Sequence, residues 1–211
     1  MTNSKPNPAA EPGANAASEP AHNSVPTAAP DEDAQLAPIP DHLAEGLDIV
    51  FVGYNPSIRS SKTGHHYANP SNRFWRILHG AGLTPRLYAS HEGDALLRLG
   101  FGFTNIVPRP TRTAEEITKD EYAAGRAELL RKLTAYRPRA ACFVGKGVYE
   151  QFAGRKTEGW GFQPDERSQV PGIREFVGPS SSGLVRMKLE EMVEIYKELA
   201  RWKRDELGRR R

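Results

Sequence analysis

The segment Leu47-Asp48-Ile49-Val50-Phe51-Val52-Gly53 decides the fold class. It is a short run of β-branched and aromatic residues that ends in glycine, a pattern typical of a buried strand. Three further strands are predicted at residues 101–107, 139–145 and 173–177. Helical patterns alternate with these strands, which favours parallel pairing with helices on both faces. We therefore expect one α/β domain of three layers, with a short, mainly parallel central sheet flanked by helices.

Three helices are predicted from capping and periodicity. Residues 70–80 place Phe74, Ile77 and Leu78 on one helical face. Residues 118–121 have the form of a capping box, which predicts a long helix that ends near Tyr136. A final helix is indicated by an apolar stripe made of Leu189, Met192, Val193, Tyr196, Leu199 and Ala200.

Composition separates the two ends from the centre. Residues 1–40 hold eight prolines, ten alanines and no aromatic residue, so they cannot bury enough apolar surface to offset the cost of ordering. We expect a disordered Pro/Ala-rich arm at 1–40, a single folded domain at 41–204 and a basic tail at 205–211.

Charge is unevenly distributed along the chain. The first 40 residues carry one basic and five acidic side chains, whereas the remainder carries 28 basic and 21 acidic ones, a net charge of +7. Such an excess attracts polyanions, of which nucleic acid is the commonest, although a basic surface can equally serve only solubility. With no apolar run near the roughly 20 residues of a membrane span, and no secretory signal, we expect a cytoplasmic protein, nucleoid-associated if bacterial. The single cysteine, Cys142, is expected to be a buried core thiol.

Four loops follow the four predicted strands. They comprise residues 54–57, 108–110, 146–147 and 178–184. Since the carboxyl ends of parallel strands meet at one edge, where ligands bind in folds of this kind, we expect these loops to form one site.

Several chemistries are excluded by missing residues. The sequence has no cysteine pair with zinc spacing and neither half of the zinc-deaminase signature. Gly145-Lys146-Gly147 lacks the glycine span and hydroxyl residue of a nucleotide-binding loop, so Lys146 either contacts a DNA phosphate or belongs to a simple turn. The serines at 180–182 lack the glycine-framed elbow and oriented base of a serine hydrolase.

Three separate motifs resemble the mismatch-specific uracil and thymine DNA glycosylases. They are residues 53–57 with 63–70 and 72–75, then Thr104-Asn105-Ile106-Val107 with Arg109-Pro110-Thr111, and finally Pro179-Ser180-Ser181-Ser182-Gly183-Leu184. The similarity runs from about residue 47 to 204. It implies the fold of these enzymes and a monofunctional glycosylase that hydrolyses the N-glycosidic bond of uracil and related damaged pyrimidines in mismatched or damaged duplex DNA, initiating base excision repair.

The resemblance also implies roles for the residues around the predicted pocket. Asn55 would hold the attacking water, because an amide oxygen accepts a hydrogen bond but is not a strong base. Asn105 would share that water or bond a base oxygen. Backbone N–H groups near Tyr54 and Tyr67 would bond the base, and the Tyr67 ring would stack beneath it. His66 would bond substrate or phosphate, or would simply be solvated.

The remaining expectations concern DNA and specificity. The resemblance implies that Ser180, Ser181, Ser182, Gly183 and Arg186 grip phosphates and that Leu184 is the wedge filling the gap left by the flipped base. Ser57 stands where the family usually has glycine, and Tyr54 replaces a smaller aliphatic residue. The Ser57 side chain is expected to crowd the 5-position of the base, which puts thymine excision in question. Some relatives carry lysine at the position of Asn105, so the base-pair preference stays open.

No metal or organic cofactor is implied, and the expected partner of a monomeric protein is double-stranded DNA containing uracil mismatches, not a membrane. Two rival functions remain. One is a catalytically silent DNA-damage-binding protein that uses the same pocket, against which the joint presence of Asn55 and Tyr67 argues. The other is a nucleotide-binding regulatory domain, which the missing phosphate-binding fingerprints disfavour.

Overall fold

The computed structural model describes residues 36–208, which form a five-stranded sheet with the order β2-β1-β3-β5-β4. β1 pairs in parallel with β2 and β3, and β3 pairs in parallel with β5, whereas β4 is antiparallel to β5. The strands are β1 (Ile49–Gly53), β2 (Phe101–Asn105), β3 (Ala140–Val144), β4 (Gly161–Phe162) and β5 (Arg174–Gly178). The predicted α/β fold with a mainly parallel sheet is confirmed.

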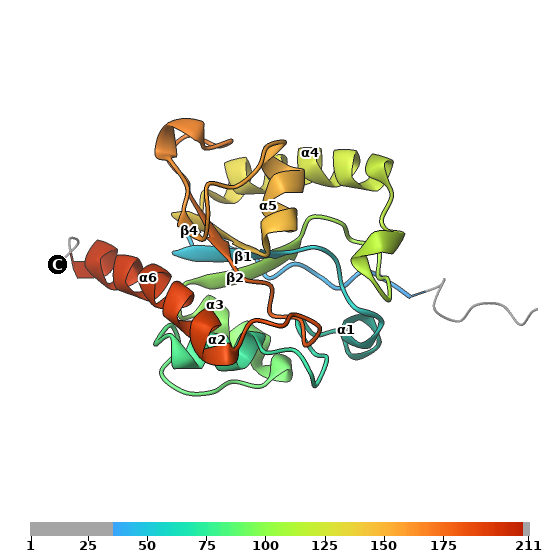
Figure 1. Cartoon of the computed structure of the whole chain (residues 1–211), viewed down its shortest axis with the longest axis horizontal. Coiled ribbons are helices and arrows are strands. Elements are labelled where there is room, and N and C mark those ends of the chain that lie inside the picture. Colours follow the sequence, from blue (N-terminus) through green and yellow to red (C-terminus); the bar gives the residue numbers. More distant parts are fainter. Residues whose placement is uncertain (1–35, 209–211) are drawn as a thin grey trace, which may run out of the picture. The chain divides into compact units, whose positions relative to one another are not determined.

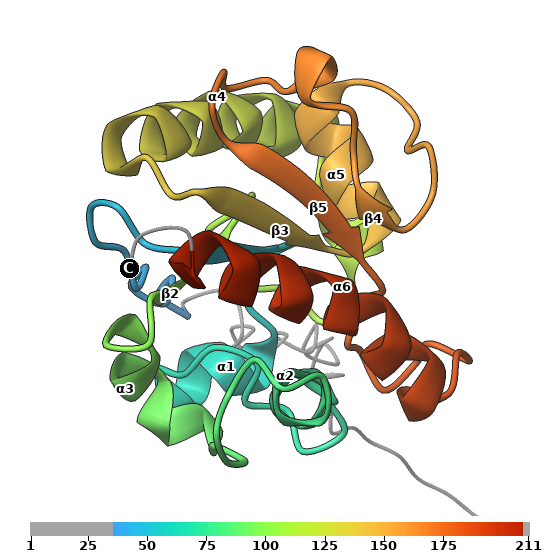
Figure 2. The ribbon, with the colours of Figure 1, turned by 90° about the vertical axis from the view of Figure 1, so that its left-hand side faces the viewer.

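Helices cover both faces of this sheet (Figure 1). Ile49 and Phe51 of β1 join the core that packs against α2 (Phe74–Gly80), α3 (Gly93–Leu97) and α6 (Leu189–Gly208). Val50 and Val52 join the opposite core, which packs against α4 (Lys119–Tyr136) and α5 (Lys146–Ala153). Figure 2 shows the sheet between these two helical layers. Because β1 is buried on both faces, its sequence is a continuous apolar run, not an alternating one.

Side-chain hydrogen bonds accompany the starts of two of the predicted helices. The hydroxyl of Thr118 accepts the N–H of Glu121, and the Glu121 carboxylate accepts the N–H of Thr118, so α4 begins directly after Thr118. α2 begins at Phe74 instead of residue 70, because the side-chain oxygen of Asn72 accepts the Phe74 N–H. The short α1 (Ile58–Thr63), which follows β1, was not predicted.

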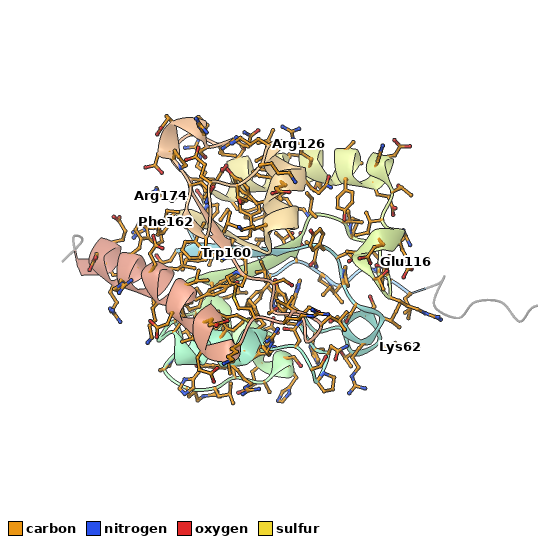
Figure 3. The ribbon with its side chains drawn as sticks, viewed as in Figure 1. Lys62, Glu116, Arg126, Trp160, Phe162 and Arg174 are labelled. Atoms are coloured by element: carbon orange, nitrogen blue, oxygen red, sulfur yellow. The ribbon has the colours of Figure 1, made fainter. Side chains whose placement is uncertain are left out.

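β4 was also not predicted, because two residues are too few to show strand periodicity. Its Phe162 ring packs edge-on against Phe176 of the neighbouring strand. The Arg174 guanidinium lies 4.6 Å from the centre of the Phe162 ring. Both residues are labelled in Figure 3. An aromatic and a cation therefore cover the exposed margin of the sheet.

The described structure continues past both predicted domain boundaries. His42 exchanges two backbone hydrogen bonds of 2.9 Å with Phe103, and Ile39 is only 8% exposed. Residues 36–40, which the sequence assigns to the arm, thus pack against the domain through an apolar anchor. α6 continues through residues 205–208 of the predicted tail. The rest of the predicted arm, residues 1–35, and residues 209–211 lie outside the described part of the chain.

Cys142 lies on β3 and is fully buried, as predicted, and burial raises the pKa of its thiol. Within residues 36–208 no helix combines the length and the apolar character needed to span a membrane.

Candidate active site

A pocket of about 320 Å³ opens at the carboxyl ends of the parallel strands. This volume lies at the small end of the range of roughly 300 to 1,000 Å³ that is usual for ligand pockets. Its walls include residues 53–57 after β1, Asn105 at the end of β2, residues 111–114, and residues 180–184 after β5. The structure thus brings loops after three of the four parallel strands into one site.

Backbone hydrogen bonds attach the loop after β1 to the loop after β2. The N–H of Val107 donates to the carbonyl of Tyr54 at 2.8 Å, and the N–H of Thr111 donates to the carbonyl of Pro56 at 3.2 Å. Asn55 lies between these two attachments and is half-buried. Its backbone is therefore fixed on both sides.

The side-chain amide of Asn55 is fixed as well. Its Nδ2 donates to the carbonyl oxygen of Arg109 at 2.8 Å and to the hydroxyl of Thr111 at 2.7 Å. The Thr111 hydroxyl donates its own hydrogen to the carbonyl of Thr113 at 2.6 Å, so it can only accept from Asn55. Both acceptors thus demand the nitrogen of the amide. The oxygen, Oδ1, is the group that Asn55 presents to the pocket.

The position of the Arg109 carbonyl depends on α4. The Arg109 guanidinium donates to both carboxylate oxygens of Glu121, at 2.5 and 3.0 Å, and to the carbonyl of Glu116 at 2.9 Å. Arg109 lowers the pKa of the Glu121 carboxyl to about 2, mainly through these hydrogen bonds. Glu121 also caps α4, so the helix start, the Arg109 loop and the Asn55 amide form one connected structure.

Tyr67 forms part of the pocket wall through a strained backbone. Its φ of 53° lies in the left-handed region, which is uncommon for a bulky residue and costs on the order of 1 to 3 kcal/mol. The ring stacks on Phe74 with centroids 3.8 Å apart and planes 11° apart. Its hydroxyl is buried and has no hydrogen-bond partner within residues 36–208, and burial raises its pKa. Packing against Phe74 therefore supports this strained backbone, which places the Tyr67 ring in the pocket wall.

His66 lies in the pocket wall but is 3% exposed, so it is not a solvated loop residue. Its Nε2 lies 3.0 Å from the carbonyl of Pro40 and must carry the hydrogen, since a carbonyl only accepts. Burial lowers the pKa of the imidazole to about 4. A ring that is neutral at neutral pH cannot attract a phosphate by charge, which disfavours that role for His66.

Among the described residues that line the pocket, none is an aspartate, a glutamate or a lysine. The wall is instead rich in amides and hydroxyls, with Arg112 as a guanidinium at its rim. Within residues 36–208 no three His, Cys, Asp or Glu side chains are grouped so that they could hold a metal ion.

A family model described as the uracil DNA glycosylase superfamily matches residues 40–200, which is most of the chain. The chain belongs to this superfamily. It is also similar to the solution NMR structure of a candidate uracil DNA glycosylase from Methanosarcina acetivorans, with 20% sequence identity and a TM-score of 0.47. That match covers 78% of this chain and 98% of the other.

Ser57 and Tyr54, which were expected to differ from the residues usual in the family, both have structural functions. The Ser57 hydroxyl accepts the N–H of Ser60 at 3.1 Å and is the N-cap of α1. The Tyr54 ring extends across to α5, where its hydroxyl occupies the space that a side chain on Gly147 would need. Burial raises the pKa of Tyr54 to about 12. Both residues also line the pocket.

Gly145 and Gly147, on either side of Lys146, are both required by the local backbone and packing. Gly145 has a φ of 127°, which side chains rarely adopt, and Gly147 accommodates Tyr54. Lys146 itself is half-buried, and its ammonium lies 4.4 Å from the centre of the exposed Trp160 ring, labelled in Figure 3. The motif is therefore a helix start, and Lys146 is not among the residues that line the pocket.

Asn105 lies at the end of β2 and lines the same pocket as Asn55. Its Oδ1 fills the space that a side chain on Gly53 would occupy. The predicted meeting of the two asparagines at one pocket is therefore observed.

The loop after β5 has both buried and exposed parts. Ser181 is 2% exposed, which suits a pocket wall better than phosphate contact, whereas Ser180 and Ser182 are half-buried. The Leu184 side chain is 89% exposed. Gly183 and Arg186 are exposed beside it.

Sequence reasoning did not assign functions to Thr111, Arg112 or Arg73. Thr111 lies within one of the quoted motifs, but its role depends on a hydrogen bond across 56 positions. Arg73 likewise acts on a loop more than 100 positions away. No local pattern reveals such contacts.

Proposed function

We propose that this protein is a monofunctional uracil-DNA glycosylase of the mismatch-specific type, which removes uracil and related damaged pyrimidines from mismatched or damaged duplex DNA and so initiates base excision repair. Membership of the superfamily supports glycosylase activity in general. The observation that carries the finer proposal is the Asn55 amide, whose nitrogen is fully engaged and whose oxygen remains for the pocket.

In the proposed reaction the bond between C1′ of the sugar and N1 of uracil breaks, and its electron pair leaves with the base. The oxygen of a water molecule then bonds to C1′, and the proton that this water loses is released to solvent. Positive charge builds on the sugar and negative charge on the base, so the catalyst must position water and tolerate an anion. A pocket wall without carboxylates suits a departing anion.

Asn55 would orient the water through Oδ1, without accepting its proton. Because no strong base assists, the rate should depend on the quality of the leaving group. Uracil leaves as a stabilised anion, and pyrimidines with electron-withdrawing groups at the 5-position leave more readily. This dependence favours damaged pyrimidines as substrates over intact cytosine.

The Tyr67 ring would support the flipped base, since stacking of a base on an aromatic ring contributes about 1 to 3 kcal/mol. Its other neighbour, Phe74, stacks on it at 3.8 Å and so keeps the ring from turning aside. Leu184 would fill the gap left in the duplex. Lys146, Ser180, Ser182 and Arg186 are proposed to contact the phosphates around it.

The test is to incubate the full chain with oligonucleotides that contain one uracil, single-stranded, opposite adenine or opposite guanine, and then to treat with alkali. Strand breaks at the uracil position are expected, fastest opposite guanine among the duplexes because a mispaired base costs less to extrude. The same sequences with thymine in place of uracil opposite adenine are the control.

The rival DNA-damage binder makes a different prediction. It would retard the uracil-containing duplex in a gel without producing alkali-sensitive sites. Such a result, obtained with protein that still binds the duplex, would contradict the proposed glycosylase activity.

A further inference from the structure

The guanidinium of Arg73 is bonded to the backbone of the loop that carries Leu184. Its Nη1 donates to the carbonyl of Met187 at 2.7 Å. Its Nη2 donates to the carbonyls of Ser182 at 2.7 Å and Val185 at 2.9 Å. The backbone N–H of Arg73 also donates to the carbonyl of Ser181 at 2.9 Å. Residues on both sides of Leu184 are therefore tied to one side chain.

The chemistry of arginine suits this contact. A planar guanidinium presents several donors in fixed directions, and hydrogen bonds from a charged donor are roughly twice as strong as neutral ones. Arg73 is half-buried, so these bonds are partly shielded from water. Both of its terminal nitrogens are occupied by loop carbonyls, which leaves Arg73 poorly placed to bind DNA itself.

The loop around Leu184 is also fixed by close packing and by a turn of its own. A side chain added at Gly183 would lie 2.7 to 2.8 Å from atoms of Ser71, so the loop backbone lies directly on the segment before α2. The N–H of Val185 donates to the carbonyl of Ser182 at 3.1 Å, closing a turn around Leu184. The Leu184 side chain is therefore 89% exposed on a turn whose backbone carbonyls are bonded to Arg73.

We infer that Arg73 is a positioning residue that holds this turn ready for insertion of Leu184 and thereby sets how well the enzyme acts on base-paired uracil relative to unpaired uracil. This inference rests on the proposed function. A loop already held in its inserting shape avoids the entropy cost of ordering on each encounter with DNA. That saving matters most where extrusion of the base is most costly, which is opposite adenine.

The experiment compares Arg73→Ala and Arg73→Lys with the parent protein under single-turnover conditions at one salt concentration. Arg76→Ala is the matched control, because Arg76 is an exposed arginine of α2 whose removal costs the same charge. For Arg73→Ala we expect a loss of about fivefold to tenfold on uracil opposite adenine, no larger than that of Leu184→Ala, a smaller loss opposite guanine, and less than a twofold loss on single-stranded DNA. Arg73→Lys, which keeps the charge but not the planar donors, should lie between Arg73→Ala and the parent.

A second readout needs no activity. Backbone hydrogen exchange in residues 181–187 should be at least tenfold faster in Arg73→Ala than in the parent or Arg76→Ala, with exchange in α4 unchanged. Equal loss of rate on all three substrates, or unchanged exchange in the loop, would overturn the inference. If the parent protein cleaves no uracil at all, the proposed function is wrong, and so is the proposed effect of Arg73 on paired relative to unpaired uracil. The hydrogen-exchange data would still decide whether Arg73 holds the loop.

Discussion

The Asn55 loop and the Leu184 loop leave the same edge of the sheet, but they are held by different means. The Asn55 loop is hydrogen-bonded to the neighbouring loop after β2 through backbone groups on both sides of the asparagine. The Leu184 loop has a turn of its own, and Arg73, the residue directly before α2, donates hydrogen bonds to three of its carbonyls. One loop is built into the sheet edge, and the other is attached to the adjoining helical layer.

This difference corresponds to different tasks. A group that orients water must stay within a fraction of an ångström of its position, because misplacement is costly to the rate. A group that enters a DNA duplex must instead be exposed, and Leu184 can be exposed because its backbone is satisfied beneath it. Mutations that displace the Asn55 amide should therefore slow cleavage of all uracil substrates alike, whereas mutations in the Leu184 loop should affect paired and unpaired uracil differently.

The largest effect is expected for Asn55→Ala. It removes the only group of this side chain that faces the reaction, so the single-turnover rate should fall by on the order of a hundredfold or more, equally on every uracil substrate. Affinity for the duplex should change little. We would measure rates by alkaline cleavage and affinity by fluorescence anisotropy. Rates equal to those of the parent would remove Asn55 from the mechanism.

Thr111→Val should have the next largest effect. The isosteric change leaves one Asn55 N–H and the Thr113 carbonyl without their partner. An unsatisfied buried group costs about 1 to 3 kcal/mol, so the amide would turn away and the rate would fall by roughly tenfold to a hundredfold. Thr111→Ser keeps the hydroxyl and is the control. A valine variant as fast as the serine variant would show that the hydroxyl does not orient Asn55.

Leu184→Ala should have a smaller and selective effect. A leucine withdrawn from water contributes about 1.5 to 3 kcal/mol, enough to decide whether a flipped base stays out. We expect a loss of about tenfold on uracil opposite adenine, less opposite guanine, and least on single-stranded DNA. The three rates, measured at one salt concentration, give the result directly. Reduction of all three by one factor would mean that Leu184 is not the wedge.

The sequence predicted those parts of the fold that local patterns encode. The apolar run of β1 and the capping box of α4 each contain their own signal, and both elements lie where expected, although the predicted strands were up to two residues too long. One strand and three α-helices were not predicted. β4 has two residues, α1 has six, and α3 has five, which is too short for a period to show, and α5 has eight residues with Gly147 in its first turn. Their formation depends on neighbours that become adjacent only after folding.

The same distinction applies to the site. The gathering of Asn55, Asn105 and the serine loop at one edge follows from parallel strand topology and could be predicted. The burial of His66 could not, because its partner is the carbonyl of Pro40, in a segment assigned to the arm. Nor could the contacts of Arg73, since its partners lie more than 100 residues away in sequence.

The smallest effects are expected at Ser57, where the structure separates two roles of one side chain. The hydroxyl is engaged in capping α1, so crowding of the 5-position of a base would come from Cβ. Ser57→Gly should therefore raise the rate on thymine opposite guanine severalfold relative to uracil opposite guanine, since only thymine carries a methyl group there. Ser57→Ala keeps Cβ and should leave that ratio unchanged.

The free energy of unfolding should distinguish the two Ser57 variants in the opposite way, with the larger change in Ser57→Ala. Loss of a serine N-cap costs about 1 kcal/mol when alanine replaces it and only a few tenths when glycine does. Ser57→Ala should thus be the less stable variant in urea unfolding, while Ser57→Gly is the one with altered selectivity. A selectivity ratio that is the same in the glycine variant and the parent would show that Ser57 caps the helix without restricting the base.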